Sequence, residues 1–169
     1  MIQVPEAEAV VGELRRRFDP SALQGVPAHV TVLVPFKDSS NLAGQDLKRL
    51  ESVFAASGPF TYCFARLGRF PDATYLAPED PVPFVGLTRD VEAAFPEFPP
   101  YGGLFPDVVP HLTVAHGAGP GLDAAQEELH GWVQCGVPIR GRCSEVLLLQ
   151  QEPGGWQVRH RFRLGSGDA

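Results

Sequence analysis

His29-Val30-Thr31-Val32 and His111-Leu112-Thr113-Val114 are two copies of one pattern, His-x-Thr-Val, about half the chain apart. Each copy opens a short apolar run, and a proline lies just before it. Successive side chains of a β-strand point to opposite faces, so His and Thr would share one face and the aliphatic residues the other. Each copy therefore predicts a strand that buries its aliphatic side and presents an imidazole together with a hydroxyl.

The elements predicted around the two copies occur in the same order. Helical spacing of apolar residues predicts the helices, and short β-prone runs between turn residues predict the strands. The helices are expected over 6–18, 45–56, 83–95 and 122–133, and the strands, besides that of the second His-x-Thr copy, over 29–34, 60–67, 73–77, 137–150 and 156–164. We expect a single bilobal domain over 1–169, with a lobe-level repeat of roughly 6–78 and 82–165 and a short flexible C-terminal tail.

Strands joined by helices or by short hairpins are typical of an α+β architecture. The duplicated order predicts two pseudo-symmetric lobes, each an antiparallel sheet with helices outside, which face each other across a central cleft. The two His-x-Thr strands would line that cleft.

The composition of the 169-residue chain limits the classes of partner. A formal net charge of −6 argues against a protein that binds nucleic acid along its phosphate backbone, but it leaves room for a small basic pocket. The three cysteines form no CxxC pair, which favours reduced thiols. No signal peptide is apparent and no apolar run is long enough to cross a membrane. We expect a cytoplasmic protein, a monomer with no membrane partner.

Two histidines across a cleft suit proton transfer on both sides of a reacting centre. An unperturbed imidazole has a pKa near 6.5, so a neutral ring can take a proton from an attacking oxygen while a charged ring gives one to the departing oxygen. The hydroxyls of Thr31 and Thr113 can donate hydrogen bonds to phosphate oxygens. His29 and His111 are thus candidate catalytic residues on a phosphodiester, with no metal or cofactor required.

The two motifs with their spacing resemble the 2H phosphoesterase superfamily, and within it the 2′-5′ RNA ligase and cyclic phosphodiesterase group. The resemblance covers roughly 25–165 and includes LGRFPDATYLAP at 67–78 and the closing LLLQQ…W…RFRLG. It implies opening of a 2′,3′-cyclic phosphate on RNA ends or small cyclic nucleotides without a metal, with 2′-5′ RNA ligation as the reverse reaction. It also implies that His29 is the acid and His111 the base.

Several other interpretations of the site stay open. The substrate could be a small nucleotide such as an ADP-ribose cyclic phosphate, or the chain could be a nucleotide or RNA-end binding module without turnover. A metal-dependent hydrolase would need a further ligand close to the pair, such as Asp107 or His116.

Further side chains are candidates for substrate contacts. Arg159 and Arg161 alternate along the last strand and Arg66 lies beside the first hairpin, so they could bind phosphate. A solvated sheet face is the alternative for the arginines of the last strand. The aromatic rings of Phe36, Phe70 and Tyr101 could stack on a base, although core packing is the alternative.

Overall fold

The computed structural model describes residues 1–136 and 138–165. Residues 166–169, the tail that was expected to be flexible, lie outside the described residues. So does residue 137, the first of the strand expected over 137–150. The helices are α1 (Glu8–Phe18), α2 (Pro20–Leu23), α3 (Gly44–Ala55), α4 (Val82–Ala94) and α5 (Pro120–Gln134), with 3₁₀ turns η1 (Pro5–Ala7), η2 (Ser39–Asn41) and η3 (Pro100–Gly103). The strands are β1 (Ile2–Gln3), β2 (His29–Val30), β3 (Phe60–Phe70), β4 (Ala73–Pro78), β5 (Leu112–His116), β6 (Ile139–Cys143), β7 (Glu145–Glu152) and β8 (Gly155–Arg163).

Six strands form one antiparallel sheet in the order β1-β2-β5-β4-β3-β6, and β7 pairs with β8 in a separate hairpin. The backbones of Met1 and Leu147 exchange two hydrogen bonds, of 2.7 and 2.8 Å, which attach the hairpin beside β1. The strands therefore follow one another in space from β8 through β7, β1 and β2 to β5, β4, β3 and β6. The predicted α+β class is confirmed.

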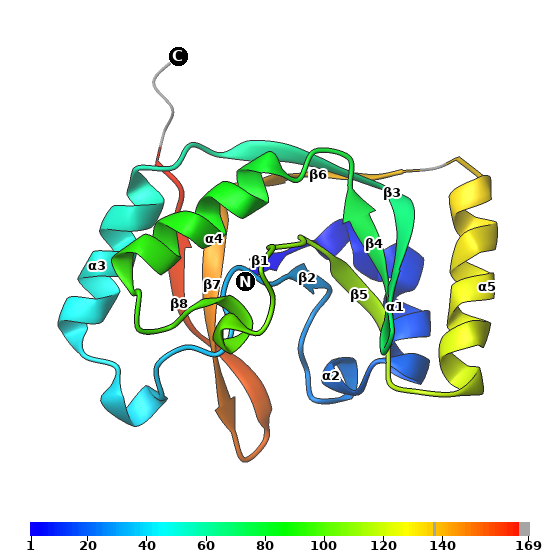
Figure 1. The fold of residues 1–169 in the computed structure, drawn as a ribbon, viewed down its shortest axis with the longest axis horizontal. Coiled ribbons are helices and arrows are strands. Elements are labelled where there is room, and N and C mark those ends of the chain that lie inside the picture. Colours follow the sequence, from blue (N-terminus) through cyan, green and yellow to red (C-terminus); the bar gives the residue numbers. More distant parts are fainter. Residues whose placement is uncertain (137, 166–169) are drawn as a thin grey trace.

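The two His-x-Thr strands are direct neighbours in this arrangement, because Val30 of β2 pairs with Leu112 of β5 (Figure 1). β5 lies next to the β3–β4 hairpin, which precedes it in the chain. β2 lies next to β1, which in turn contacts the β7–β8 hairpin from the end of the chain. β5 therefore lies on the same side as the β3–β4 hairpin, and β2 lies on the same side as the β7–β8 hairpin. If the chain is divided into the two predicted repeats, each His-x-Thr strand lies beside the hairpin of the other one.

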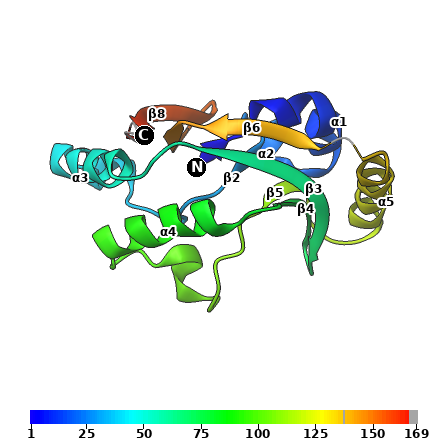
Figure 2. The same cartoon turned by 90° about the horizontal axis from the view of Figure 1, so that it is seen from above.

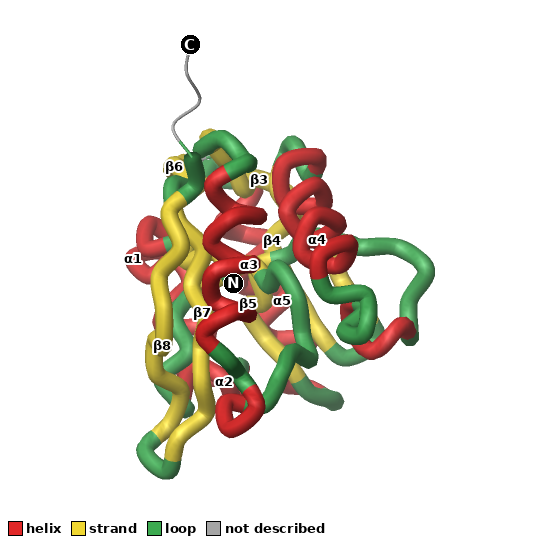
Figure 3. Tube along the Cα trace, turned by 90° about the vertical axis from the view of Figure 1, so that its left-hand side faces the viewer, coloured by secondary structure: helices red, strands yellow, loops and turns green. Residues whose placement is uncertain are grey.

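The alternation predicted for the two motifs is confirmed by burial. Val30, Leu112 and Val114 are at most 1% exposed and Val32 is 6% exposed, and all four belong to the main core. α3 and α4 pack at one end of the molecule and α1 and α5 at the other, with β2 and β5 between them (Figures 1 and 2). The β7–β8 hairpin runs alongside α3 (Figure 3). The motif strands therefore lie in the middle of the fold, between the α3–α4 pair and the α1–α5 pair.

The strand expected over 29–34 is shorter than predicted. Only His29 and Val30 pair in the sheet, and the chain then bends away toward Pro35, which has no N–H to donate to a neighbouring strand. α1, α3, α4 and α5 lie within a few residues of the predicted ranges, whereas the short α2 was not predicted. In the part of the chain that the structure describes, no helix combines the length and the apolar character needed to cross a membrane.

Candidate active site

His29 and His111 are anchored in the same way. Nδ1 of His29 lies 2.8 Å from the carbonyl oxygen of Pro27, and Nδ1 of His111 lies 2.7 Å from that of Val109. In both cases the carbonyl belongs to the residue two positions earlier. A carbonyl oxygen can only accept, so Nδ1–H of each ring must be the donor. Both neutral rings therefore carry their hydrogen on Nδ1 and keep Nε2 as an unprotonated base.

The register of β2 and β5 places each histidine across from the threonine of the other motif. Val30 is opposite Leu112, and moving one residue along each antiparallel strand brings His29 opposite Thr113 and Thr31 opposite His111. These side chains share the face opposite to the buried aliphatic residues. The two histidines are diagonal neighbours, a relation in which Cβ atoms lie about 7–8 Å apart or somewhat less. The site therefore has an approximate two-fold symmetry, with its axis between the strands.

Burial sets the protonation of both imidazoles. It lowers the pKa of His29 to about 4, with the hydrogen bond to the Pro27 carbonyl opposing this effect. Burial also lowers the pKa of His111, less far, and the Val109 carbonyl again opposes it. In the absence of substrate both rings are therefore neutral near pH 7. A bound phosphate anion would raise both pKa values, because an opposite charge within about 4–6 Å favours the protonated ring.

The lowered pKa of His29 predicts a loss of stability in acid. Between pH 6.5, the pKa of an unperturbed histidine, and pH 4, the unfolded chain takes up a proton at this position and the folded chain does not. The free energy of unfolding should therefore fall as the pH is lowered through this window, by about 2–3 kcal/mol from this residue. Urea denaturation of the wild type and of His29→Asn measures the effect, and the variant should lose less stability. The same substitution at the exposed His130 is the control, and equal losses in all three proteins would contradict the prediction.

Aromatic rings surround His111. The ring centroid of Phe70 lies 5.0 Å from that of His111 in an edge-to-face arrangement, and Tyr75 lies 5.3 Å away. The ring of Tyr101 is nearly parallel to the imidazole at 6.5 Å. Tyr75 extends across β3 at Gly68, its direct partner in the sheet, where a Cβ atom would overlap the tyrosine ring. Gly68 therefore makes room for one wall of the His111 site.

The loop that carries Tyr101 is tied to the other motif. Tyr101 has a left-handed backbone (φ 53°), as do Gly102 and Gly103, and its N–H donates to the carbonyl oxygen of Val34 at 2.6 Å. Val34 is the last residue of the segment 29–34, which begins with the first motif. This hydrogen bond links the aromatic wall of His111 to the chain that leaves the first motif.

A cavity of about 620 Å³ opens beside His29. It lies between the segment that follows β2 and the β7–β8 hairpin, and both His29 and Thr31 line it. Aliphatic side chains make up much of the remaining wall, and its polar and aromatic members include Asp38, Gln150, Gln151, Trp156, Arg159 and Lys37, which is paired with Asp46. His111 and Thr113 are not part of this wall. The space next to His29 is therefore wide and lined by side chains of both charges, whereas aromatic rings flank His111.

The six predicted substrate contacts fall into two groups. Phe70 and Tyr101 flank His111, and Phe36 and Arg159 line the cavity beside His29. Phe36 also packs edge-on against Phe95 at 5.2 Å, so it belongs partly to the core, as the alternative interpretation proposed.

Arg66 and Arg161 are occupied elsewhere in this structure. Arg66 donates to the carbonyl oxygens of Pro78 and Glu79 at 2.5 and 3.1 Å, and Arg161 lies 2.6 Å from Glu145. The expected alternation on the last strand fails because β8 has a bulge.

The bulge follows from the pairing of β7 with β8. Leu148 is opposite His160 and Leu149 is opposite Val158, so Arg159 is the extra residue. The bulge separates Arg159 from Arg161 and leaves only Arg159 at the cavity.

The additional metal ligands considered from the sequence do not gather here. Across residues 1–136 and 138–165, no three His, Cys, Asp or Glu side chains are placed to hold a metal ion together. His116 is exposed at the end of β5, with its Nε2 3.5 Å from a carboxylate oxygen of Asp72. It lines a different, smaller cavity, of about 240 Å³, beside α2 and the start of α5.

Sequence reasoning missed Tyr75, Trp156 and the residues that hold the segment before His29. Tyr75 joins the site only through its register with Thr113, which no local pattern indicates. The burial of Arg15, on α1, could have been inferred from its position. Arg15 lies four residues after the buried Val11, where helical spacing predicts a side chain on the buried face of the helix.

Comparison with known proteins agrees with this architecture. Residues 3–155 match the family described as the 2′-5′ RNA ligase superfamily. Proteins of Bacillus cereus strain G9842 and Bacillus anthracis strain CDC 684, each named "Putative phosphoesterase", are 28% identical over 162 residues, which is 92% of this chain and 88% of theirs. The crystal structure of TT0787 of Thermus thermophilus superposes with a TM-score of 0.65 at 18% identity, covering 98% of this chain and 96% of that one.

The fold and the paired His-x-Thr strands define a two-histidine protein of the 2H class, as the resemblance implied. The match over most of the chain makes the family definite: this chain belongs to the 2′-5′ RNA ligase superfamily.

Proposed function

We propose that this protein is a phosphodiesterase that opens the 2′,3′-cyclic phosphate of RNA ends or nucleotides by acid–base catalysis with His29 and His111. One observation carries the proposal: two imidazoles, each held by its Nδ1–H on a backbone carbonyl, lie diagonally on neighbouring strands, each opposite a threonine. Such a site has two bases on two sides of one centre and two hydroxyl donors between them. A phosphodiester uses all four groups.

The reaction would proceed in one displacement at phosphorus. One neutral imidazole accepts a proton through Nε2 from water, whose oxygen forms a bond to phosphorus. The other imidazole, protonated when the anionic substrate is bound, donates its proton to the ribose oxygen as the P–O bond of the ring breaks. The hydroxyls of Thr31 and Thr113 would donate to the non-bridging oxygens. With an RNA 5′-hydroxyl in place of water, the same ring opening would form a bond from the 5′-oxygen to phosphorus and release the protonated 3′-oxygen, which gives 2′-5′ ligation.

The surroundings of the two histidines differ, which favours a substrate with a charged group at one end and a flat group at the other. Arg159 lines the cavity beside His29 and suits a further phosphate, whereas Lys37 in the same wall is paired with Asp46 at 2.9 and 3.0 Å. Phe70 and Tyr101 beside His111 suit a base or another flat group, and such stacking is worth about 1–3 kcal/mol per base. An RNA end or a nucleotide offers both chemistries.

The test is hydrolysis of nucleoside 2′,3′-cyclic monophosphates and of a short RNA ending in a cyclic phosphate, with and without EDTA. We expect hydrolysis that survives the chelator. Activity abolished by EDTA would replace this mechanism with a metal-dependent one. Binding of the substrates without turnover would instead favour the nucleotide or RNA-end binding module.

A further inference from the structure

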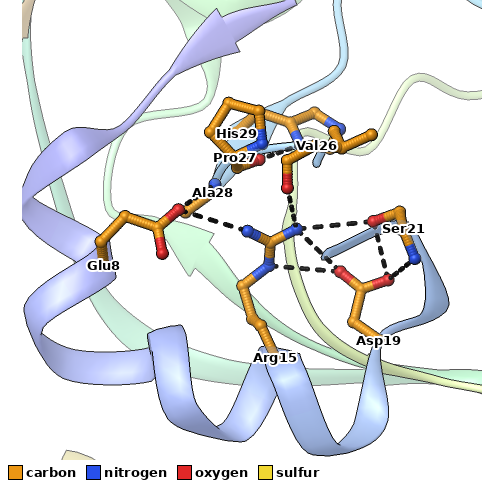
Figure 4. A network of polar contacts seen from close by, with 8 residues as sticks. All are labelled: Glu8, Arg15, Asp19, Ser21, Val26, Pro27, Ala28 and His29. Atoms are coloured by element: carbon orange, nitrogen blue, oxygen red, sulfur yellow. Dashed lines mark hydrogen bonds and ion pairs between the residues drawn. The ribbon is translucent and has the colours of Figure 1, made fainter. Parts of the chain in front are cut away.

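Arg15 is the largest fully buried side chain of the described residues, and its guanidinium lies directly below the segment that leads to His29 (Figure 4). It projects from α1 and is 1% exposed. A guanidinium stays charged at any physiological pH, so burying it is costly unless its donors are satisfied by acceptors and an opposite charge.

The acceptors around Arg15 come from three segments of the chain. Nε and Nη2 donate to the same carboxylate oxygen of Asp19, at 3.2 and 2.9 Å, and Nη2 also donates to the carbonyl oxygen of Val26 at 3.1 Å. Nη1 lies 3.4 Å from a carboxylate oxygen of Glu8. The other oxygen of Asp19 accepts from the N–H and the hydroxyl of Ser21, near the start of α2.

This network holds three consecutive residues immediately before His29. The Val26 carbonyl accepts from Arg15, and the Ala28 N–H donates to Glu8 at 2.6 Å. Between them, the carbonyl of Pro27 accepts from Nδ1–H of His29 at 2.8 Å. Figure 4 shows these contacts converging on one short stretch of backbone. The orientation of the Pro27 carbonyl is therefore fixed from both sides by charged groups on α1.

Stability alone is a weak reason for such an arrangement. Replacing a buried ion pair by well-packed apolar residues is often neutral or stabilising, because desolvation offsets the attraction. What a guanidinium adds here is direction, since its planar donors fix the positions of Asp19 and Val26 at once. Ser21 and Val26 also line the cavity beside His29, so the network shapes that wall as well.

We propose that Arg15 and Glu8 are positioning residues for His29: they hold the Val26–Ala28 backbone so that the Pro27 carbonyl keeps the imidazole in its Nδ1–H form with Nε2 toward the substrate. This rests on the proposed function, in which His29 Nε2 exchanges a proton during phosphodiester hydrolysis.

The experiment compares two variants with two matched controls on the same helix. Arg15→Met removes the guanidinium, and Glu8→Ala removes the acceptor of the Ala28 N–H. Arg16→Met and Glu13→Ala make the same changes at exposed positions. Two quantities are measured on each folded protein: kcat and KM for a 2′,3′-cyclic nucleotide, and the tautomer of each histidine ring from nitrogen–proton NMR correlation.

We expect kcat to fall by about 10- to 100-fold in both test variants, with a much smaller change in KM, because a misplaced general acid or base costs rate more than binding. His29 should show a mixture of tautomers while the His111 ring signals stay unchanged. Both controls should match the wild type.

Unchanged kcat per folded molecule together with an unchanged His29 tautomer would overturn the proposal and leave the network a purely structural role. If Arg15→Met does not fold, Glu8→Ala decides alone, since the Glu8 side chain is 41% exposed and its loss disturbs the core less. If the wild type hydrolyses no cyclic phosphate, the proposed function fails, and the NMR measurement still tests the positioning of His29.

Discussion

His29→Ala and His111→Ala are each expected to lower kcat for hydrolysis of a 2′,3′-cyclic phosphate by about 10²–10⁴-fold. Each substitution removes one of the two proton-transfer groups and leaves its partner and both threonines in place. Steady-state kinetics on nucleoside 2′,3′-cyclic monophosphates measures the loss. His130→Ala, at an exposed position on α5, is the control and should retain wild-type activity.

A change of leaving group then separates the two roles. 4-Nitrophenolate departs from phosphorus without being protonated, so a 4-nitrophenyl phosphodiester needs the base and not the acid. The variant that lacks the acid should recover most of its activity on this substrate, and the variant that lacks the base should not. Equal losses on both substrates would show that the histidines do not divide the roles in this way, and full activity in either variant would remove that histidine from the mechanism.

The resemblance and the electrostatics make opposite predictions for this experiment. The resemblance implies that His29 is the acid. Burial, however, lowers the pKa of His29 to about 4 and that of His111 less far, so the free protein holds a proton more easily on His111. A phosphate bound closer to His29 than to His111 would reverse that order. Recovery of the His29 variant on the nitrophenyl substrate would support the resemblance, and recovery of the His111 variant would support the electrostatic order.

Thr31→Val and Thr113→Val are expected to lower kcat by about 10²-fold each. Valine has nearly the shape of threonine and suits a strand, so the change removes a hydroxyl donor with little effect on the fold. The loss should appear mainly in kcat, because a donor aimed at the non-bridging oxygens matters most when charge develops on them. Thr61→Val, at an exposed position on β3, is the matched control. A rise in KM with unchanged kcat would assign the hydroxyls to substrate binding alone.

The alternation in the two motifs was predictable because a one-residue shift would have turned His and Thr into the core. Val30 and Leu112 are buried as that argument requires, and the duplicated order of elements indicated two related halves. Which strand pairs with which was beyond the sequence, because long-range pairing depends on the whole sheet and not on local pattern. The cleft was therefore expected between separate lobes, whereas β2 and β5 share hydrogen bonds.

A β-bulge and a buried charge account for the other differences between the predicted and the observed positions of side chains. The extra residue Arg159 in β8 shifts the alternation that would have placed Arg161 beside it, and nothing in a run of alternating arginines indicates where a bulge will fall. Arg15 is one of three consecutive arginines, which is typical of an exposed helix end. Its burial depends on Asp19 and on the backbone of Val26, which approach it only in the folded chain.

The position of each His-x-Thr strand beside the hairpin of the other predicted repeat has a consequence for how such a site could arise. Each His-x-Thr strand supplies one histidine and one threonine, and each histidine lies across from the threonine of the other copy. Two separate copies of a single repeat, associated about a two-fold axis with their hairpins swapped, would produce the same four groups in the same arrangement. A single chain that carries both copies would keep such a symmetric dimer permanently assembled. It would also free the two sides to diverge, one toward the aromatic rings around His111 and the other toward the open cavity beside His29.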